Sequence, residues 1–421
     1  MGVYDVIIVG SGPAGATAAY FLGQTGLKVL VLDKAKVPRY KACGGGLSEH
    51  VLRAHFPFSF EPVIESRVSS VSFALGRRTL TQALGNQAVC TVMRDRFDAH
   101  ILAHSQAEVH TGEAVRSVRE TDVGVVVETQ GGARYDGRYL IGADGSNSVV
   151  ARSLGLRRHK ITAAAIEAEI PAPGEVLSRF GSSLLFIFGE VRMGYLWIFP
   201  KAAHLSVGIG ALRPRPGELQ AVLRRVMARY GLDLSGIPLH GHPIPVFLGG
   251  EPVATGRSLL VGDAAGLADP LTGEGIRLAI KSGRMAAEAI LAETPAKYAR
   301  ELRRRIGRCH EAGLALTWLF YHFPGVCLAL GARNPFVTEA FADMLADRTD
   351  YPEVMLRMFV SLPLYWLTEG AASLAGLLGR RSLGARIRGL AYGPADGTLA
   401  AGSSERQQPV QPSAWVAPQA R

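Results

Sequence analysis

Two apolar runs near the start of the chain flank a segment with helical spacing. DVIIVG (residues 5–10) and KVLVLD (28–33) do not alternate between apolar and polar residues, which is typical of strands buried on both faces of a parallel sheet. Residues 14–22 between them place apolar side chains at helical intervals. The pattern predicts a strand–helix–strand unit with the helix packed on the sheet.

The buried-strand pattern returns twice later in the chain. It appears near residue 140 in RYLIGAD and near residue 260 in SLLVGDAAG, which a long helix over 275–292 follows. Residues 160–250 are instead rich in short strand patterns, with one helical interruption near 216–230. Because strands of one sheet flank this block on both sides, we interpret it as an insertion.

The chain therefore divides into four predicted parts. A discontinuous nucleotide-binding domain takes residues 1–158 and 250–295, and residues 159–249 form a β-rich insertion that is expected to bind the substrate. Residues 296–392 form a helical C-terminal region. Residues 393–421 are rich in Gly, Ser, Pro and Gln, which predicts a disordered tail.

The turn between the first strand and the first helix carries the pattern G-x-G-x-x-G. Its glycines are Gly10, Gly12 and Gly15, and Asp33 ends the second strand. Glycines permit a tight turn and let backbone N–H groups approach a pyrophosphate at the helix N-terminus, while the acidic side chain accepts hydrogen bonds from ribose hydroxyls. The arrangement predicts a dinucleotide-binding site.

Two later segments repeat the form of a buried strand followed by a turn of small residues. The first, YLIGADGSNSVVA, ends its strand at Asp144, and the second, LLVGDAAGLADPLTGEGIRLAI, ends its strand at Asp263. Asp263 is expected to accept from a ribityl hydroxyl. The helix that begins near Gly275 and Ile276 would direct its positive end at the pyrimidine side of a flavin ring. The cofactor therefore need not be NAD.

Charge and cysteine content narrow the classes of partner. The net charge of +10 suits a phosphate-bearing cofactor or an anionic membrane surface, and also ordinary exposed helices. No zinc-finger, basic-zipper or RNA-binding signature accompanies it, so nucleic acid is not expected. The four cysteines show no close pairing, so we expect neither a metal site nor a disulfide, which fits a reducing compartment. The first residues read as a strand and not as a signal peptide.

The three strand–turn motifs together resemble the FAD-binding fold of the p-hydroxybenzoate hydroxylase superfamily, over residues 3–290. Three segments are similar to the geranylgeranyl reductase family within it: PRYKACGGGL (38–47), VMRDRFDAHI (92–101) and YLWIFPK (195–201). The resemblance implies an α/β fold, with a Rossmann-like FAD-binding domain of the p-hydroxybenzoate hydroxylase type, an inserted β-rich substrate domain and a helical C-terminal region.

The resemblance also implies an activity. It is that of an FAD-dependent oxidoreductase acting on CH–CH groups, which saturates isolated C=C bonds of geranylgeranyl or other polyprenyl chains by flavin hydride transfer plus protonation. The sequence shows no second nucleotide fingerprint, so NADPH would bind transiently or ferredoxin would supply the electrons. The FAD contacts of the family carry over to Ala14, Asp33, Cys43, Gly44, Gly46, Arg94, Ala114, Asp263, Gly275 and Ile276.

Several of these positions admit two interpretations. Cys43 is either a small packing residue or a group beside the flavin, and it is the one catalytic candidate. Arg94 either meets a pyrophosphate oxygen or lies on the surface. Tyr195, Trp197 and Phe199 alternate along a strand and share one face, so they form either the core of the inserted sheet or an aromatic wall that binds an apolar substrate. The glycines at 44–46 are expected to leave room for a flat ring or a lipid chain.

Two C-terminal segments, residues 312–331 and 358–378, are strongly apolar and approach the length of a membrane span. Proline and polar residues interrupt both, and arginine-rich segments at 300–308 and 379–389 flank them. We expect interfacial helices on an anionic bilayer, which would place a cytoplasmic protein peripherally at the inner face of the membrane. Helices lining a lipid tunnel, or a true span, are the alternatives.

Other functions fit the same scaffold. A flavin-dependent monooxygenase or halogenase is one, although YLWIFP lacks the first tryptophan of the W-x-W-x-I-P segment of halogenases. A non-catalytic flavoprotein that carries or senses a lipid is another. Within the reductase hypothesis the substrate can be geranylgeranyl diphosphate, a geranylgeranylated chlorophyll precursor, a diether lipid or a polyprenyl-quinone side chain. The sequence does not indicate which, nor the oligomeric state.

Overall fold

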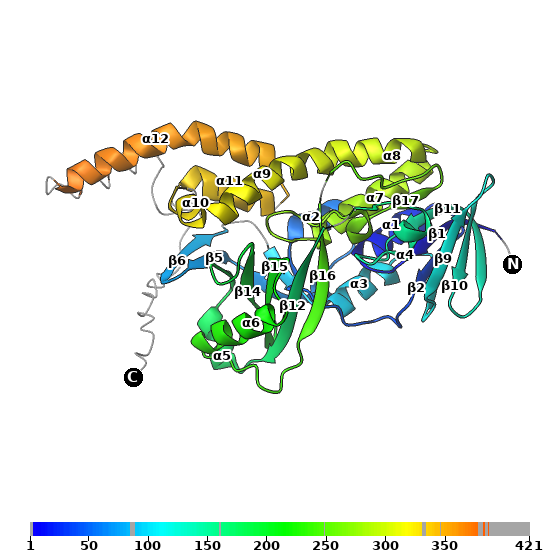
Figure 1. The fold of residues 1–421 in the computed structure, drawn as a ribbon, viewed down its shortest axis with the longest axis horizontal. Coiled ribbons are helices and arrows are strands. Elements are labelled where there is room, and N and C mark those ends of the chain that lie inside the picture. Colours follow the sequence, from blue (N-terminus) through cyan, green and yellow to red (C-terminus); the bar gives the residue numbers. More distant parts are fainter. Residues whose placement is uncertain are drawn as a thin grey trace.

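The computed structural model describes residues 3–84, 89–159, 161–247, 249–330, 334–345 and 347–377, and also residues 382, 383 and 386. Within them, two large sheets lie next to each other, and a series of helices runs along one edge of the molecule (Figure 1). The tail predicted for residues 393–421 lies outside the described residues.

The first sheet is built from the buried apolar runs. Its described strands are β1 (Tyr4–Val9), β2 (Val29–Asp33), β8 (Glu108–Thr111), β9 (Val115–Glu120), β10 (Val125–Thr129), β11 (Arg134–Gly142) and β17 (Ser258–Leu260). The order is β8-β2-β1-β11-β10-β9, and β17 pairs with the end of β11. Strands β8, β2, β1, β11 and β17 are parallel, and β10 and β9 form an antiparallel edge. The apolar runs near residues 140 and 260 therefore join the sheet that the N-terminal strand begins.

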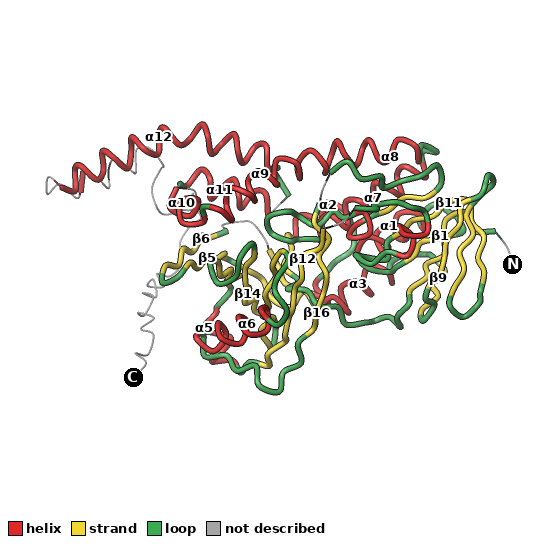
Figure 2. The backbone as a smooth tube through the Cα atoms, in the orientation of Figure 1, coloured by secondary structure: helices red, strands yellow, loops and turns green. Residues whose placement is uncertain are grey.

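The second sheet carries most of the strand-rich block. Its described strands, in order, are β16 (His240–Val246), β12 (Ile161–Pro171), β15 (His204–Leu212), β14 (Gly194–Pro200), β13 (Ser183–Phe188), β5 (Ser70–Leu75) and β6 (Arg78–Ala83). Strand β5 pairs in parallel with β13. Strands β5 and β6 belong to the 1–158 segment, so two separate parts of the chain build this sheet. Helix α6 (Glu218–Arg229) packs on one face of it, next to α5 (Gly174–Phe180) (Figure 2).

A small sheet and five helices surround the first sheet. The small sheet has the order β3 (Gly46–Ser48), β7 (Val89–Val92) and β4 (Ile64–Val68). The helices are α1 (Pro13–Gly23), α2 (Glu49–His55), α3 (Arg94–Ala103), α4 (Val149–Ser153) and α7 (Ile276–Leu291), with short 3-10 turns at Glu61–Val63 and Gly262–Ala265. Helix α7 crosses α1 so closely that a Cβ atom on Gly283 would lie 2.3 Å from the Ala14 carbonyl oxygen. This crossing fixes the start of α7 beside the glycine turn.

The C-terminal region is helical, as the sequence predicts. It contains α8 (Pro295–Leu302), a π-helical turn (Arg303–Gly307), α9 (Arg308–His322), α10 (Pro324–Leu330), α11 (Pro335–Leu345) and α12 (Tyr351–Leu377). Helix α12, in orange in Figure 1, extends beyond the second sheet at the end opposite the N-terminus. The Tyr351 hydroxyl donates to Asp269 Oδ1 at 2.6 Å, which ties α12 to the loop before α7. In the part of the chain that the structure describes, no helix has the length and apolar character needed to cross a bilayer.

Candidate functional site

One large cavity, of about 730 Å³, lies between the first sheet and the face of the second sheet opposite α6. It begins at the carboxyl ends of β1 and β2, where parallel-sheet folds bind ligands, and continues to the aromatic side chains of β14. All but one of the residues singled out in the sequence line it. They are Gly10, Gly12, Ala14, Asp33, Cys43, Gly44, Gly46, Arg94, Ala114, Tyr195, Trp197, Phe199, Asp263, Gly275 and Ile276.

Gly15 is the exception, and the glycine turn explains why. A Cβ atom on Gly15 would lie 1.9 Å from the Gly10 carbonyl oxygen, so Gly15 lets α1 pack against the end of β1. Gly10 has φ +100°, and a Cβ atom there would lie 2.4 Å from the Ala143 carbonyl oxygen. These two glycines are required by packing. A Cβ atom on Gly12, in contrast, would meet no atom closer than 3.6 Å.

Asp33 is buried at the end of β2, and its carboxylate shapes the turn. Oδ2 accepts from the backbone N–H of Ser11 at 2.8 Å and from the Ser11 hydroxyl at 2.5 Å, and Oδ1 accepts from the Ala35 N–H at 2.9 Å. The Asp33 carbonyl accepts from the Glu113 N–H at 2.9 Å, which places Ala114 beside this end of the strand. The carboxylate lies at the cavity wall, as the predicted ribose contact requires.

Arg94 opens α3 and is only 4% exposed, so it is not a surface arginine. Its Nε and Nη2 atoms donate to the two carboxylate oxygens of Asp98, both at 2.8 Å. Burial alone would lower the pKa of this guanidinium, but the Asp98 carboxylate holds it above its ordinary value. The Cys43 side chain lies close to this guanidinium and also lines the cavity. A cation thus stays charged at the cavity wall beside the cysteine.

Asp263 lines the same cavity next to the start of α7. Its Oδ2 atom is 3.6 Å from Lys41 Nζ and 3.9 Å from His242 Nε2, and a Cβ atom on Gly275 would lie 3.3 Å from its Oδ1. Burial alone would raise the pKa of the Asp263 carboxyl, but Lys41 and His242 hold it below its ordinary value. Burial and the nearby Arg94 lower the pKa of Lys41. The carboxylate is therefore ionised and accepts hydrogen bonds.

The three consecutive glycines have different roles. Gly44 packs against the aromatic strand, because a Cβ atom there would lie 2.9 Å from the Phe199 ring. Gly45 has φ +68°, and its Cβ atom would lie 2.1 Å from the Val92 carbonyl oxygen. The buried Lys201 ammonium donates to the carbonyls of Gly44 at 2.7 Å and Val92 at 2.8 Å. Gly45 thus serves the backbone packing itself, and the expectation that these glycines leave room for a ligand does not apply to it.

Tyr195, Trp197 and Phe199 share one face of β14, where they are part of the core and of the cavity wall; that they bind an apolar substrate stays a prediction. Trp197 and Phe199 are at most 8% exposed and belong to a hydrophobic cluster, and all three side chains also line the cavity. Trp197 lies over Gly208 of β15, where a Cβ atom would be 2.1 Å from the indole. The Tyr195 hydroxyl donates to the Thr272 carbonyl. The cavity therefore ends at an ordered aromatic wall.

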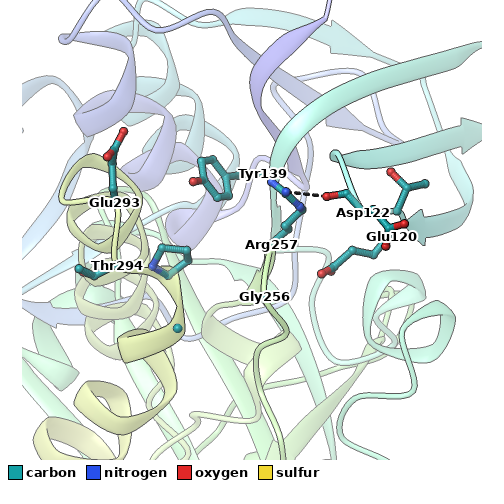
Figure 3. A pocket seen from close by; sticks show the side chains of 10 residues that line it. Glu120, Asp122, Tyr139, Gly256, Arg257, Glu293 and Thr294 are labelled. Carbon is teal, nitrogen blue, oxygen red and sulfur yellow. Dashed lines mark hydrogen bonds between the residues drawn. The ribbon is translucent and has the colours of Figure 1, made fainter.

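A second cavity, of about 550 Å³, lies at the edge of the first sheet (Figure 3). Glu120, Asp122, Tyr139 and Arg257 line it, and the Arg257 guanidinium donates to the Asp122 carbonyl at 2.8 Å. The Glu120 carboxylate already accepts from the hydroxyls of two neighbouring residues. None of the residues predicted from the sequence lies there, so the first cavity is the candidate site.

Comparison with known proteins bears directly on this cavity. A family model described as FAD binding domain matches residues 3–176. Digeranylgeranylglycerophospholipid reductase 2 of Methanothermobacter thermautotrophicus is 30% identical over 340 residues, which cover 74% of this chain and 86% of that protein. Geranylgeranyl diphosphate reductase of Rhodobacter capsulatus is 31% identical over 307 residues, covering 69% and 75%. The chain belongs to the geranylgeranyl reductase family of FAD-dependent oxidoreductases.

Other similarities agree with this family. Menaquinone reductase of Mycolicibacterium smegmatis is 30% identical over 309 residues, which cover 68% of this chain and 75% of that protein. The crystal structure of a geranylgeranyl bacteriochlorophyll reductase-like protein from Thermoplasma acidophilum has a TM-score of 0.70 at 26% identity, and covers 86% of this chain and 96% of that chain. A flavin-dependent halogenase, CmlS, has a TM-score of 0.61 at 23% identity, which shows a shared fold.

The cavity of this geranylgeranyl reductase family member fits FAD. The open position at Gly12 lies 3.6 Å from Arg39 Nη2 and 3.9 Å from Arg94 Nη2, measured from an ideal Cβ atom. Two guanidinium groups thus lie near the N-terminus of α1, and such an arrangement has the chemistry to hold a pyrophosphate. Asp33 lies on the ribose side of this turn, and Asp263 lies beside the start of α7, where a ribityl chain would pass. The residues present therefore match the chemistry of the cofactor.

Several residues in or next to the cavity of the family member were not predicted from the sequence. Arg39, Lys41, Glu167 and His242 line the cavity. Asp98 and Lys201 do not line it, but they bind the lining residues Arg94 and Gly44. The spacing of Arg94 and Asp98, four residues apart in a predicted helix, is a signal that would have indicated their ion pair. Lys41 and His242 approach Asp263 from distant parts of the chain, and no local pattern signals that contact.

Proposed function

We propose that this protein is an FAD-dependent reductase that saturates isolated C=C bonds in the chain of a geranylgeranyl or other polyprenyl lipid. The observation that carries the proposal is the continuity of one cavity from the glycine turn to the aromatic wall of β14. A cofactor at the first end and an apolar chain at the second would meet beside Gly44 and Gly46. The relatives named as reductases of geranylgeranyl diphosphate and of digeranylgeranylglycerophospholipid support the same substrate class.

The second end of the cavity suits a substrate without hydrogen-bonding groups. Its apolar lining comprises Val71, Ala165, Leu184, Phe186, Tyr195, Trp197, Phe199 and Ile244. Burial of apolar surface contributes about 25 cal/mol per Å² and would hold a polyprenyl chain there. The faces of Tyr195 and Trp197 would stabilise the positive charge that develops on the tertiary carbon when the alkene is protonated.

The chain's own residues would bind and orient the cofactor. Bound reduced FAD supplies a hydride, which is two electrons and one proton. Arg94 and the open turn at Gly12 would hold the pyrophosphate, and Asp33 would accept from the ribose. The N-terminus of α7 would direct its partial positive charge at the ring. Cys43 lies between the two ends of the cavity and stays a candidate for contact with the flavin.

We also propose that the C-terminal helices attach the protein to a bilayer surface at the cytoplasmic face. The exposed apolar residues of α12 are Leu356, Phe359, Val360, Leu364, Trp366, Leu367 and Leu374. Their helical spacing gathers them on one broad face. Glu301 and Glu311 pair with the arginines of the π-helical turn, so these arginines offer less charge to an anionic surface. We therefore expect the apolar face of α12 to contribute more to membrane binding than these arginines do. Carbonate should release the protein from membranes with no need for detergent, and high salt alone should release less of it, because salt does not weaken apolar contacts.

Anaerobic turnover tests the catalytic proposal. Protein loaded with FAD and reduced chemically is incubated without oxygen with geranylgeranyl diphosphate, digeranylgeranylglycerophospholipid or menaquinone. Mass spectrometry should find pairs of hydrogen atoms added to one of these chains. NADPH and reduced ferredoxin are then compared as electron donors. A product that forms only with oxygen and gains an oxygen or halogen atom would refute the reductase in favour of a monooxygenase or halogenase.

A further inference from the structure

A buried glutamate on the second sheet has no role in the function described so far. Glu167 of β12 is 2% exposed and lines the large cavity. In the sheet register it lies opposite Gly208 of β15, and Gly208 lies opposite Trp197 of β14. Directly opposed residues share a face, and adjacent strands are about 4.8 Å apart, so Glu167 stands about 10 Å from the aromatic strand on the same face. Because Gly208 has no side chain, the indole of Trp197 lies over it, and a Cβ atom at 208 would be 2.1 Å from the indole.

The two oxygens of the Glu167 carboxyl differ in their partners. Oε1 accepts from the Ser206 hydroxyl at 2.6 Å. Oε2 is buried and meets no donor among the described residues. Its neighbour is the carboxyl of Glu169, and two carboxyl groups can hydrogen-bond only when one of them holds a proton. A proton on Glu167 therefore satisfies an atom that would otherwise be buried without a partner.

The surroundings of Glu167 favour this protonated form. Burial, and then the charge of Glu169, raise the pKa of Glu167 to about 8. The pKa of Glu169 is lowered, because His204 and Glu167 outweigh the effect of its own burial. Five titratable or charged groups face Glu167. Glu169 is on its own strand, His204 is on β15 and Lys201 is in the turn before β15. His240 is on β16, and Tyr40 is in the loop before β3.

The neighbours of Glu167 also lead away from the cavity. His204 Nε2 is 3.0 Å from Glu169 Oε2, and both of these side chains are about one-fifth exposed. Neither lines the cavity, whereas Glu167 does. The three groups thus lie in a row from the cavity lining to the partly exposed His204, although Glu169 Oε2 and His204 Nε2 form no hydrogen bond in this arrangement of the side chains. A turn of the imidazole that completes this hydrogen bond would let the row replace a proton that the pocket consumes.

We propose that Glu167 is the group that protonates the alkene, and that Glu169 and His204 return a proton to it from solvent. This rests on the proposed reductase function. In the step, the π bond of the alkene breaks, one carbon forms a C–H bond with the proton of Glu167, and the other forms a C–H bond with the hydride from reduced flavin. The flavin is oxidised, the alkene is reduced, and Glu167 is left as a carboxylate.

Infrared difference spectroscopy tests the proton on Glu167 without any turnover. Spectra of the wild type and of Glu167→Gln, both without substrate, are compared from about pH 5 to about pH 9. Glutamine keeps an acceptor for Ser206, so the fold is expected to persist. The C=O band of a protonated carboxylic acid should be present in the wild type at neutral pH, be lost near pH 8, and be absent from the variant. A carboxyl band that is lost near the ordinary glutamate value of about 4.3 would overturn the proposal.

The anaerobic assay tests the delivery of the proton. The wild-type rate should fall above about pH 8, and Glu167→Gln should lose about 100-fold or more of the rate while binding FAD normally. Glu167→Asp should recover part of it. Glu169→Gln removes a charge that raises the pKa of Glu167, so the fall in rate should move to lower pH. Glu128→Gln, at an exposed position of β10 in the first sheet, is the matched control and should change nothing.

Two outcomes distinguish a failure of the Glu167 assignment from a failure of the proposed reductase function. If the wild type saturates polyprenyl chains and Glu167→Gln keeps its rate and pH profile, the assignment of Glu167 is wrong and the reductase function stands. If the wild type saturates none of the chains tested, the proposed function and the delivery step both fail, whatever the infrared band shows.

Discussion

Replacing Gly45 with alanine should destabilise the fold far more than the same change at Gly46, one residue later. Gly45 has φ +68°, and its Cβ atom would lie 2.1 Å from the Val92 carbonyl oxygen and 2.7 Å from Lys201 Nζ. At Gly46 the nearest atom to a Cβ is in the Phe199 ring, at 3.4 Å. The contact at Gly45 is with the Val92 backbone, which cannot move without breaking other hydrogen bonds. The contact at Gly46 is with the edge of the Phe199 ring, which can shift slightly.

The magnitude follows from two contributions. A left-handed backbone costs an L-residue about 1–2 kcal/mol. The displaced Val92 carbonyl accepts from the Lys201 ammonium at 2.8 Å, and a hydrogen bond to a charged group contributes about 1.5–3 kcal/mol. Gly45→Ala should therefore lower the free energy of unfolding by about 2.5–5 kcal/mol. Gly46→Ala adds one methyl group in near-normal contact and should cost about 1 kcal/mol or less.

Urea denaturation followed by tryptophan fluorescence measures both changes, with the same saturating FAD in every sample because a bound ligand adds its own stability. The residual activity of each folded variant is measured below its transition. We expect Gly46→Ala to stay folded and to alter activity, since its Cβ atom would enter the cavity wall between the cofactor and the aromatic strand. If the two variants unfold within about 0.5 kcal/mol of each other, the packing role assigned to Gly45 is wrong.

Three further outcomes are expected. The pKa of Asp263 is below its ordinary value, so its carboxylate stabilises the fold above about pH 4, and this stability is lost as the pH falls. The urea midpoint of Asp263→Asn should therefore drop less between pH 7 and pH 3 than the midpoint of the wild type. The double variant Arg94→Gln/Asp98→Asn leaves no buried unpaired charge, and should weaken FAD binding about 10- to 100-fold in a fluorescence titration; unchanged affinity would exclude a pyrophosphate contact. Tyr351→Phe removes the hydrogen bond to Asp269 and should cost about 1–3 kcal/mol in the same urea assay.

The sequence predicted the parts of the site that lie close together in the chain. The glycine turn and Asp33 belong to one strand–helix–strand unit, and the spacing alone positions them. The helix that begins at Ile276 and the alternation of Tyr195, Trp197 and Phe199 are equally local patterns. For these, hydrophobic periodicity and backbone chemistry are sufficient.

The parts that were missed depend on contacts between distant segments. Lys41 and His242 reach Asp263 only after the two sheets have packed. The neighbourhood of Glu167 depends on the register of β12, β15 and β14, and a shift of one residue would turn its side chain to the other face. Strand β5 joins β13 across more than a hundred residues, and no feature of either strand indicates its partner. Such pairings are decided by packing over the whole fold.

The glycine at position 208 and the tryptophan at position 197 limit each other's side-chain size. The indole of Trp197 occupies the space that any side chain at 208 would need. A Cβ atom at 208 would also lie 2.6 Å from the Ile166 carbonyl oxygen, so a smaller residue at 197 does not by itself make room for a side chain at 208. Across related sequences that keep this sheet, position 208 should therefore stay glycine even where the residue at 197 changes.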